Sequence, residues 1–300
     1  MKKFFKWIGI VLASLLALIV IVFFVMALKG NARITQTFDV SAENVVIPTD
    51  AESIARGEHW VMAECIGCHK DDLSGDSAFF KSPFGTIESK NLTLGKGGAG
   101  SEFKDKDWIR AIRHGVNPED HSLFIMPSPN FWYFSDEDLG DIIAYVKSIP
   151  PVDHETDEPN LNLLGKAMIG AGILGKGVLA AQDIQHNMRP DYPATGITVE
   201  YGTYLVNVSG CHDCHGSKLS GGKSADPTAK AAPNLTPGGD LISWQEADFI
   251  KTIRTGVPPK GKPLDPKQMP WQHYKNFSDG ELKAIFMYLQ SLPKQETIVP

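Results

Sequence analysis

The stretch Cys65-Ile66-Gly67-Cys68-His69 decides the fold, and it has a counterpart in Cys211-His212-Asp213-Cys214-His215. Two thiols three positions apart, followed at once by a histidine, form the pattern that attaches c-type haem through two thioether bonds, with the histidine on the iron. In a helical turn, positions three apart share one face, so both sulfurs can reach the same porphyrin edge. The sequence therefore predicts two covalently bound haem c groups, one held by Cys65, Cys68 and His69, the other by Cys211, Cys214 and His215.

The cysteine count restricts the alternatives. All four cysteines of the 300-residue chain belong to the two motifs, which leaves none for a disulfide framework or a separate nucleophile. Two Cys-x-x-Cys pairs can build a structural zinc site, and one can act as a thioredoxin-like redox pair. Each motif, however, lies in its own repeat with its own Met-Pro loop, and no βαβ pattern surrounds either one. Haem attachment is therefore the favoured interpretation.

The N-terminus predicts a membrane anchor. Trp7 to Leu28 is an uncharged run of 22 residues, preceded by three lysines, and this length can cross a bilayer as a helix. A secretory signal peptide is the competing interpretation, because Val25-Met26-Ala27 resembles a cleavage site. We expect an uncleaved single-pass anchor over residues 1–30 and a tether over residues 31–52.

The charge balance argues against one class of partner. The chain carries 29 basic and 35 acidic side chains, a formal net charge of −6. Nucleic-acid-binding domains instead show a strongly basic face. We expect no nucleic-acid partner.

Residues 198–296 repeat the pattern of residues 53–151. The stretches Asn91-Leu92-Thr93, Ile112-Arg113, Met126-Pro127 and Phe134-Ser135-Asp136 recur in the same order as Asn234-Leu235-Thr236, Ile253-Arg254, Met269-Pro270 and Phe277-Ser278-Asp279. Self-similarity of this kind indicates a duplicated structural unit. We therefore expect one domain of about 100 residues used twice, with residues 152–197 joining the two copies.

Each repeat carries the signals of several helices. A helix capped by Thr49 or Asp50 should run into the first haem motif, and a second, amphipathic one should stop at Gly115. A third should begin after Ser135, with its counterpart after Ser278. The prediction is an all-α fold.

Two methionines stand at matched positions before proline. Met126 and Met269 follow the motif histidines by 57 and 54 residues, in loops that can present a thioether to the second axial position of the iron. A soft thioether favours Fe(II) and raises the reduction potential. We predict that His69 and Met126 bind one iron and that His215 and Met269 bind the other, with His121 as an alternative ligand to Met126.

Two further features leave alternatives open. The matched Arg113 and Arg254 suit a haem propionate, and equally a solvated position on a helix. The segment Leu161 to Ala181 is apolar but contains Lys166, Lys176 and several glycines. It is therefore expected to form a surface helix, or one packed against the haem domains, rather than a second membrane span.

With these residues in place, the chain resembles a tandem pair of class I cytochrome c domains on a membrane anchor. It is similar to the haem-carrying subunits and di-haem cytochromes of bacterial dehydrogenases and respiratory chains, over nearly the whole chain beyond residue 50. The resemblance implies crossed first and last helices in each domain, Gly57 and Gly202 at the crossings, and methionine as the sixth iron ligand. Such proteins receive haem outside the cytoplasm, so it also implies domains on the periplasmic side of the inner membrane, or on the outer surface in an organism without a periplasm.

The resemblance further implies an electron-transfer protein rather than an enzyme. Electrons would come from a membrane dehydrogenase or a quinol-oxidising complex and pass to a terminal acceptor, so the expected partners are redox proteins. A di-haem, peroxidase-like enzyme is the alternative, and it requires one iron with an open site. A haem subunit of a dehydrogenase complex is a further alternative.

Overall fold

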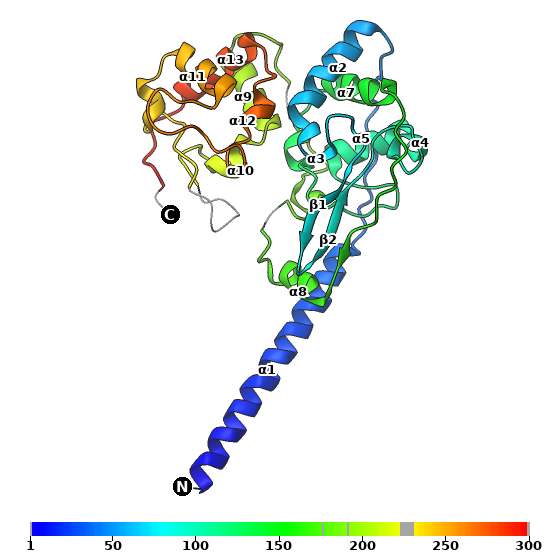
Figure 1. The fold of residues 1–300 in the computed structure, drawn as a ribbon, viewed down its shortest axis with the longest axis vertical. Helices are drawn as coiled ribbons and strands as arrows, with labels where there is room; N and C mark the ends of the chain where they lie inside the picture. Colours follow the sequence, from blue (N-terminus) through cyan, green and yellow to red (C-terminus); the bar gives the residue numbers. More distant parts are fainter. Residues whose placement is uncertain (1, 176, 191, 223–230, 299–300) are drawn as a thin grey trace.

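The computed structural model describes residues 2–175, 177–190, 192–222 and 231–298. Its longest helix, α1 (Lys2–Ile34), projects from a mostly helical body (Figure 1). Large apolar side chains are exposed along most of this helix. Within the described ranges it is the one helix long and apolar enough to cross a membrane. The expected apolar N-terminal helix is therefore confirmed.

The first domain is organised by two crossed helices. The N-cap of α2 (Ala51–Glu64) is Asp50, whose side chain accepts a hydrogen bond from the Ser53 amide. This helix packs across α7 (Asp136–Ser148), as expected. A β-carbon at Gly57 would lie 2.0 Å from the Asp141 carbonyl oxygen, so the two backbones touch and only glycine fits. The shorter helices of this domain are α3 (Ile66–His69), α4 (Ala99–Glu102), α5 (Asp105–His114) and α6 (Ser128–Phe131).

The second domain has the same helix order. Its crossed pair is α9 (Val199–Val208) and α13 (Asp279–Ser291). A β-carbon at Gly202 would lie 2.0 Å from the Ala284 carbonyl oxygen, which confirms the second expected crossing. Between them come α10 (Cys211–His215), the 3-10 helix η2 (Asp240–Ser243), α11 (Glu246–Thr255) and α12 (Trp271–Tyr274).

The helix ends follow the sequence signals. Ser135 and Ser278 each accept a hydrogen bond from the backbone amide three residues on, at the starts of α7 and α13. Gly115 ends α5 with φ of 62°, and Gly256 ends α11 with φ of 69°. These left-handed caps satisfy terminal carbonyl groups at little steric cost. The predicted caps are confirmed.

A small sheet corrects the all-α prediction. Strands β1 (Asp76–Ser82) and β2 (Gly85–Ser89) form an antiparallel hairpin, and β3 (Asn160–Leu161) pairs with β2, giving the order β1-β2-β3. The hairpin turns at Pro83 and Phe84. Its short strands lie in a glycine- and serine-rich stretch, where a period-2 pattern is hard to distinguish from a run of turns. The fold is mostly helical, with this one hairpin reaching toward α8 (Figure 1).

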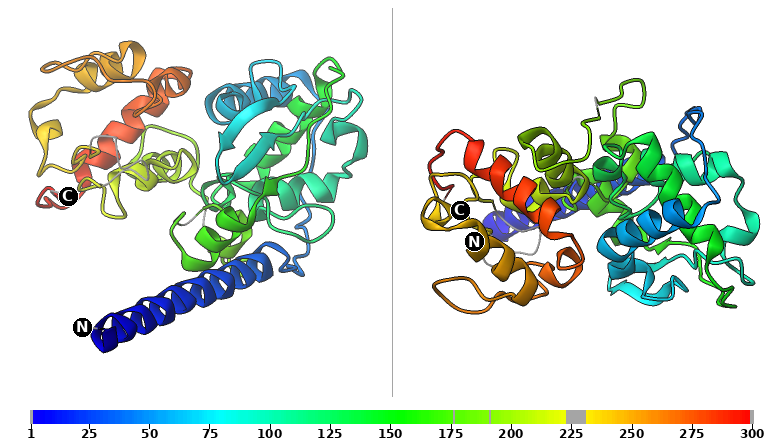
Figure 2. Two further views of the ribbon diagram at one scale, coloured as in Figure 1. Left: turned by 60° about the horizontal axis from the view of Figure 1, so that its bottom comes forward. Right: turned by 90° about the horizontal axis from the view of Figure 1, so that it is seen from above.

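The joining segment contains α8 (Leu163–Ala171) and the 3-10 helix η1 (Ala180–Asp183). The helix α8 lies on the surface, as expected, but its main partner is the C-terminal end of α1 (Figure 2). One residue of the expected apolar segment, Lys176, lies outside the described residues. The segment therefore connects α1 with the first domain.

Candidate functional site

Four residues chosen from the sequence meet around one cavity in the first domain. Cys65, Cys68, His69 and Met126 all line a cavity of about 890 Å³. The histidine comes from α3, while the methionine comes from the loop before α6. His121, the alternative ligand, lines the same cavity. Apolar side chains complete the wall, among them Trp108, Ile112, Phe131, Phe134 and Ile142.

Both motif histidines are oriented by a backbone carbonyl group. The Nδ1 atom of His69 lies 2.7 Å from the Lys90 carbonyl oxygen, and that of His215 lies 2.8 Å from the Pro233 carbonyl oxygen. Because a carbonyl can only accept, each Nδ1 carries the proton and each Nε2 keeps its lone pair. Burial lowers the pKa of both histidines, which favours the neutral ring. Ligating histidines typically show this arrangement.

An asparagine follows each of these carbonyl groups, and its side chain fixes the loop through a hydrogen bond. The side-chain amide of Asn91 donates to the Val152 carbonyl oxygen at 2.7 Å, and that of Asn234 donates to the Gln295 carbonyl oxygen at 3.0 Å. Both asparagines are buried. The repeated Asn-Leu-Thr sequence therefore ties the loop that orients the histidine to the chain after the last helix of its domain.

The second domain has matching local geometry. Cys211, Cys214 and His215 lie on α10, and His215 is 6% exposed. Cys211 and Met269 are partly buried and pack against the hydrophobic core. Met269 precedes α12, as Met126 precedes α6. The second set of predicted residues thus comes from the same places in the fold as the first.

The chemistry of the donors fits covalent haem better than zinc. Burial raises the pKa of the Cys211 thiol to about 12 and also raises that of Cys65, so both thiols are neutral before any group is attached. Among the residues that the structure describes, no cluster of three or more His, Cys, Asp or Glu side chains could hold a metal ion. Two thiols, an imidazole with its Nδ1 proton engaged and a thioether around one cavity suit a thioether-linked porphyrin.

Sequence analysis missed the segment that covers the Met126 loop. Leu179, just before η1, forms a β-bridge with Phe124. The Ile125 amide donates to the Val178 carbonyl oxygen at 3.1 Å. Ile125 itself has φ of 58°, a conformation that a β-branched residue adopts only when its surroundings enforce it. The apolar run from Val178 to Ala181 was the available signal.

Residues at equivalent positions of the two domains make equivalent contacts across the domain interface. His59 and Tyr204 each lie two positions after a crossing glycine, and Asp138 and Glu281 are each the third residue of a last helix. His59 contacts Glu281 at 2.9 Å, and the Tyr204 hydroxyl donates to Asp138. Such reciprocal pairing is the mark of a two-fold interface. The two domains are therefore related by an approximate two-fold axis.

The two haem motifs lie at this interface. The Asn130 side-chain amide, four residues after Met126, donates to the Asp213 carboxylate at 2.7 Å. By the same symmetry, the His273 ring, four residues after Met269, lies against Gly67, within 3.1 Å of where a β-carbon would be. Each motif thus contacts the methionine-bearing region of the other domain.

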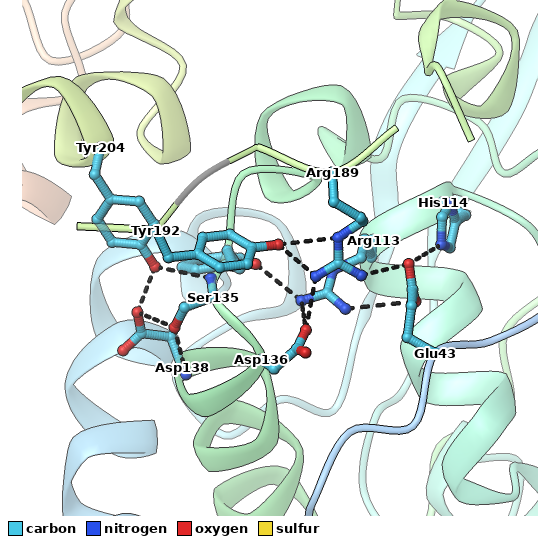
Figure 3. Close-up of polar contacts among 10 residues, drawn as sticks. Glu43, Arg113, His114, Ser135, Asp136, Asp138, Arg189, Tyr192 and Tyr204 are labelled. Atoms are coloured by element: carbon cyan, nitrogen blue, oxygen red, sulfur yellow. Dashed lines mark hydrogen bonds and ion pairs between the residues drawn. The ribbon is translucent and has the colours of Figure 1, made fainter. Parts of the chain in front are cut away.

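The matched arginines have partners within the protein. Arg113 is fully buried and pairs with Asp136 at 2.8 Å and with Glu43 at 3.4 Å (Figure 3). Arg254 pairs with Asp279 at 2.8 Å. Each arginine therefore holds the first residue of a last helix. The shared role is to fix that helix, and the propionate interpretation receives no support from these contacts.

A second arginine joins the first cluster from the joining segment. Arg189 pairs with Asp136 at 2.7 Å and with Glu43 at 2.5 Å, and it also contacts Tyr192 (Figure 3). This cluster links the tether, α7 and the joining segment. It is a structural network on the first domain.

Two separate parts of the chain match known families. Residues 54–150 match the family described as cytochrome c, and residues 199–289 match the family described as cytochrome C oxidase, cbb3-type, subunit III. Each match contains one Cys-x-x-Cys-His motif.

Curated relatives span both domains. The chain is 27% identical over 267 residues to the fructose dehydrogenase cytochrome subunit of Gluconobacter japonicus, covering 80% of this chain and 53% of that protein. It is 28% identical over 276 residues to the gluconate 2-dehydrogenase cytochrome c subunit of Pantoea cypripedii, covering 80% and 59%. It is 27% identical over 277 residues to the cytochrome c subunit of a quinone-dependent alcohol dehydrogenase of Gluconobacter oxydans, covering 81% and 55%. The chain spans a little more than half the length of these relatives. It carries two cytochrome c-type domains in tandem and is homologous to the cytochrome c subunits of dehydrogenases.

Proposed function

We propose that this chain is a membrane-anchored di-haem cytochrome that carries electrons from a membrane dehydrogenase to a further acceptor. The observation that carries the proposal is the repeated donor set: two thiols, a histidine held through Nδ1, and a methionine before proline in each domain. The relatives, which are cytochrome subunits of dehydrogenases, favour a dehydrogenase as the donor. A quinol-oxidising complex is the other donor class.

The proposed sites use the residues of each repeat in fixed roles. Cys65 and Cys68 form the thioether bonds of the first domain, and Cys211 and Cys214 those of the second. A bound haem supplies reversible one-electron chemistry between Fe(III) and Fe(II). His69 and Met126 would bind the iron of one haem, and His215 and Met269 that of the other, which would leave no position on either iron for a substrate.

The domain interface suits transfer within the chain. Each motif contacts the other domain, through Asn130 and Asp213 on one side and through His273 and Gly67 on the other. The domains are held by matched polar contacts, which fix the separation of the two sites. A relay within one rigid body needs no docking step between the sites.

With a histidine and a methionine proposed as ligands to each iron, neither iron would have an open position. A peroxidase-like enzyme needs one. The carrier is proposed as the non-catalytic member of any complex it joins. We propose the haem domains over residues 53–151 and 198–296, with residues 152–197 as the joining segment.

The N-terminal helix is proposed as a retained anchor over residues 1–30, with residues 31–52 as the tether. Gly30 and the carbonyl group of Met26 lie against α8. Cleavage after Ala27 would remove part of this packing, whereas a signal peptide needs no contact with the mature fold. We place the haem domains on the periplasmic side of the inner membrane, where haem attachment to such motifs takes place.

The test is a spectrum of the oxidised full-length protein with and without cyanide or hydrogen peroxide. Two low-spin haems that ignore both reagents are expected. Met126→Ala and Met269→Ala should each open one iron to cyanide and lower one midpoint potential, because each removes a thioether that favours Fe(II). A high-spin haem in the unmodified protein, or variants with unchanged potentials, would contradict the proposal.

The donor is tested in detergent-solubilised membranes. A dehydrogenase that co-purifies with the chain and reduces both haems when given its substrate is the expected result. Reduction by a quinol in the absence of any dehydrogenase would point to the other donor class.

A further inference from the structure

The end of the N-terminal helix and α8 touch backbone to backbone. A β-carbon at Gly30 would lie 1.8 Å from the Lys166 carbonyl oxygen, and one at Gly170 would lie 1.9 Å from the Met26 carbonyl oxygen. No side chain fits at either glycine without separating the helices. Figures 1 and 2 show α8 at the point where α1 meets the body.

Polar contacts hold α8 in this place from two further directions. Arg33 donates to the Ile169 carbonyl oxygen at 2.6 Å, and the Lys166 ammonium donates to the Asn31 side chain at 2.9 Å. On the other side, the Asn162 amide donates to the carbonyl oxygen of Phe84, at the hairpin tip, at 3.0 Å. The helix is thus fixed to both the anchor and the first domain.

Large apolar side chains are exposed at both ends of α8. Leu163 is 46% exposed and Leu164 is 43% exposed, and Ile173, just after the helix, is 68% exposed. The buried residues of the helix are Gly165, Ala167, Ile169 and Gly170. The two glycines Gly165 and Gly170 therefore lie against the hairpin tip and α1, whereas large apolar side chains at the two ends of the helix remain exposed.

The length of the anchor indicates the depth, relative to the bilayer, at which α8 lies. The uncharged run from Trp7 to Leu28 measures about 33 Å as a helix, against about 30 Å for the hydrocarbon core of a bilayer. Its outer end therefore lies near Leu28, which is 71% exposed. Met26 and Gly30, the residues that touch α8, are at that same level.

We propose that α8 is an in-plane membrane helix, with Leu163, Leu164 and Ile173 inserted at the outer lipid–water boundary beside the anchor. The exposed apolar side chains of α1 extend to Leu28, the level at which α1 contacts α8, and a lipid surface is the occupant that would cover both sets of side chains. Helices of this kind bury one apolar face at the level of the headgroups. The inference rests on the retained anchor of the proposed function. It assigns α8 the role of fixing the angle between the anchor and the haem domains.

The test measures the depth of nitroxide labels in the full-length holoprotein. The native cysteines are thioether-linked under the proposed function, so Leu164→Cys and Ile173→Cys each provide one free thiol. The labelled protein is placed in nanodiscs of phosphatidylcholine and phosphatidylglycerol. Relaxation by oxygen, which concentrates in lipid, is compared with relaxation by a water-soluble nickel chelate. Val46→Cys, at a position 79% exposed on the body, is the aqueous control, and Leu12→Cys marks the anchor.

The expected result is that labels at 164 and 173 respond to oxygen and not to the chelate, as the label at 12 does, while the label at 46 responds to the chelate. If the labels at 164 and 173 match the one at 46 while the label at 12 lies in lipid, the anchor stands and α8 is not a membrane helix. Labels at 164 and 173 shielded from both reagents would mean that protein, a second copy or a partner subunit, covers these positions, which overturns the proposal. A label at 12 in water would instead refute the anchor.

Discussion

Glu64 carries a buried carboxyl group between the two haem motifs, and its replacement by glutamine gives a sharp prediction. It is the last residue of α2 and directly precedes Cys65. Its carboxyl group lines the first cavity and contacts the Ser209 hydroxyl of the second domain at 2.9 Å. Burial raises the pKa of Glu64 from 4.5 to about 8, against a smaller opposing effect of the Ser209 hydrogen bond.

The sign of the effect on stability follows from proton binding. Between pH 4.5 and about 8 the folded protein keeps a proton on Glu64 that the unfolded chain has lost. Stability therefore falls as pH rises through this window, by about 1.4 kcal/mol for each pH unit in its middle part. From pH 5 to pH 8 the loss due to this group is about 3–4 kcal/mol. Glu64→Gln keeps the shape and the acceptor oxygen but removes the titration.

The assay is denaturant unfolding of the full-length holoprotein in detergent at pH 5 and pH 8. The advantage of the Glu64→Gln variant over the parent should grow by about 3–4 kcal/mol between the two values, while all other titrating groups cancel in the difference. Ser209→Ala should extend the fall in stability to higher pH, because it removes a donor to the charged form. An advantage that stays constant with pH would refute the reasoning.

Two sets of substitutions test the packing by denaturant unfolding. Gly57→Ala and Gly202→Ala should each lower the free energy of unfolding by about 1–3 kcal/mol, because the new carbon would lie 2.0 Å from a carbonyl oxygen. The control Gly280→Ala, with no neighbour nearer than 3.8 Å, should cost nothing, and equal effects at all three positions would contradict the close crossings. Arg113→Leu should cost about 1–3 kcal/mol, because it removes a fully buried guanidinium that donates to the Phe134 carbonyl oxygen and pairs with Asp136. Arg254→Leu, whose side chain is 31% exposed, should cost less than about 1 kcal/mol. Equal costs would show that burial does not set the strength of these pairs.

The repeat identified the candidate site residues. A pattern that occurs twice separates a candidate ligand from core filling, which is how Met126 and Met269 stood out from the other methionines. The caps at Ser135 and Ser278 followed from local rules that act within a few residues, whereas the crossing glycines were expected from the resemblance to class I cytochrome c domains. The caps depend on short-range chemistry, so the sequence displays them directly.

Contacts between residues far apart in the chain could not be predicted from the sequence. The role of Arg113 depends on Glu43, which the tether brings to it from far along the chain. The contact of α8 with α1 depends on two glycines about 140 residues apart, neither of which belongs to a periodic pattern. The approximate two-fold axis requires knowing which surfaces meet, and residues such as His59 and Tyr204 differ in type even though their positions match.

The covalent haem count of the purified full-length chain tests the central claim most directly. Intact mass and reduced-haem absorbance should give two haems per chain, one for each motif. Cys65→Ala/Cys68→Ala and Cys211→Ala/Cys214→Ala should each retain one, with the remaining site still low-spin. One haem or none in the unmodified chain, or loss of both from either double variant, would contradict two independent and equivalent sites.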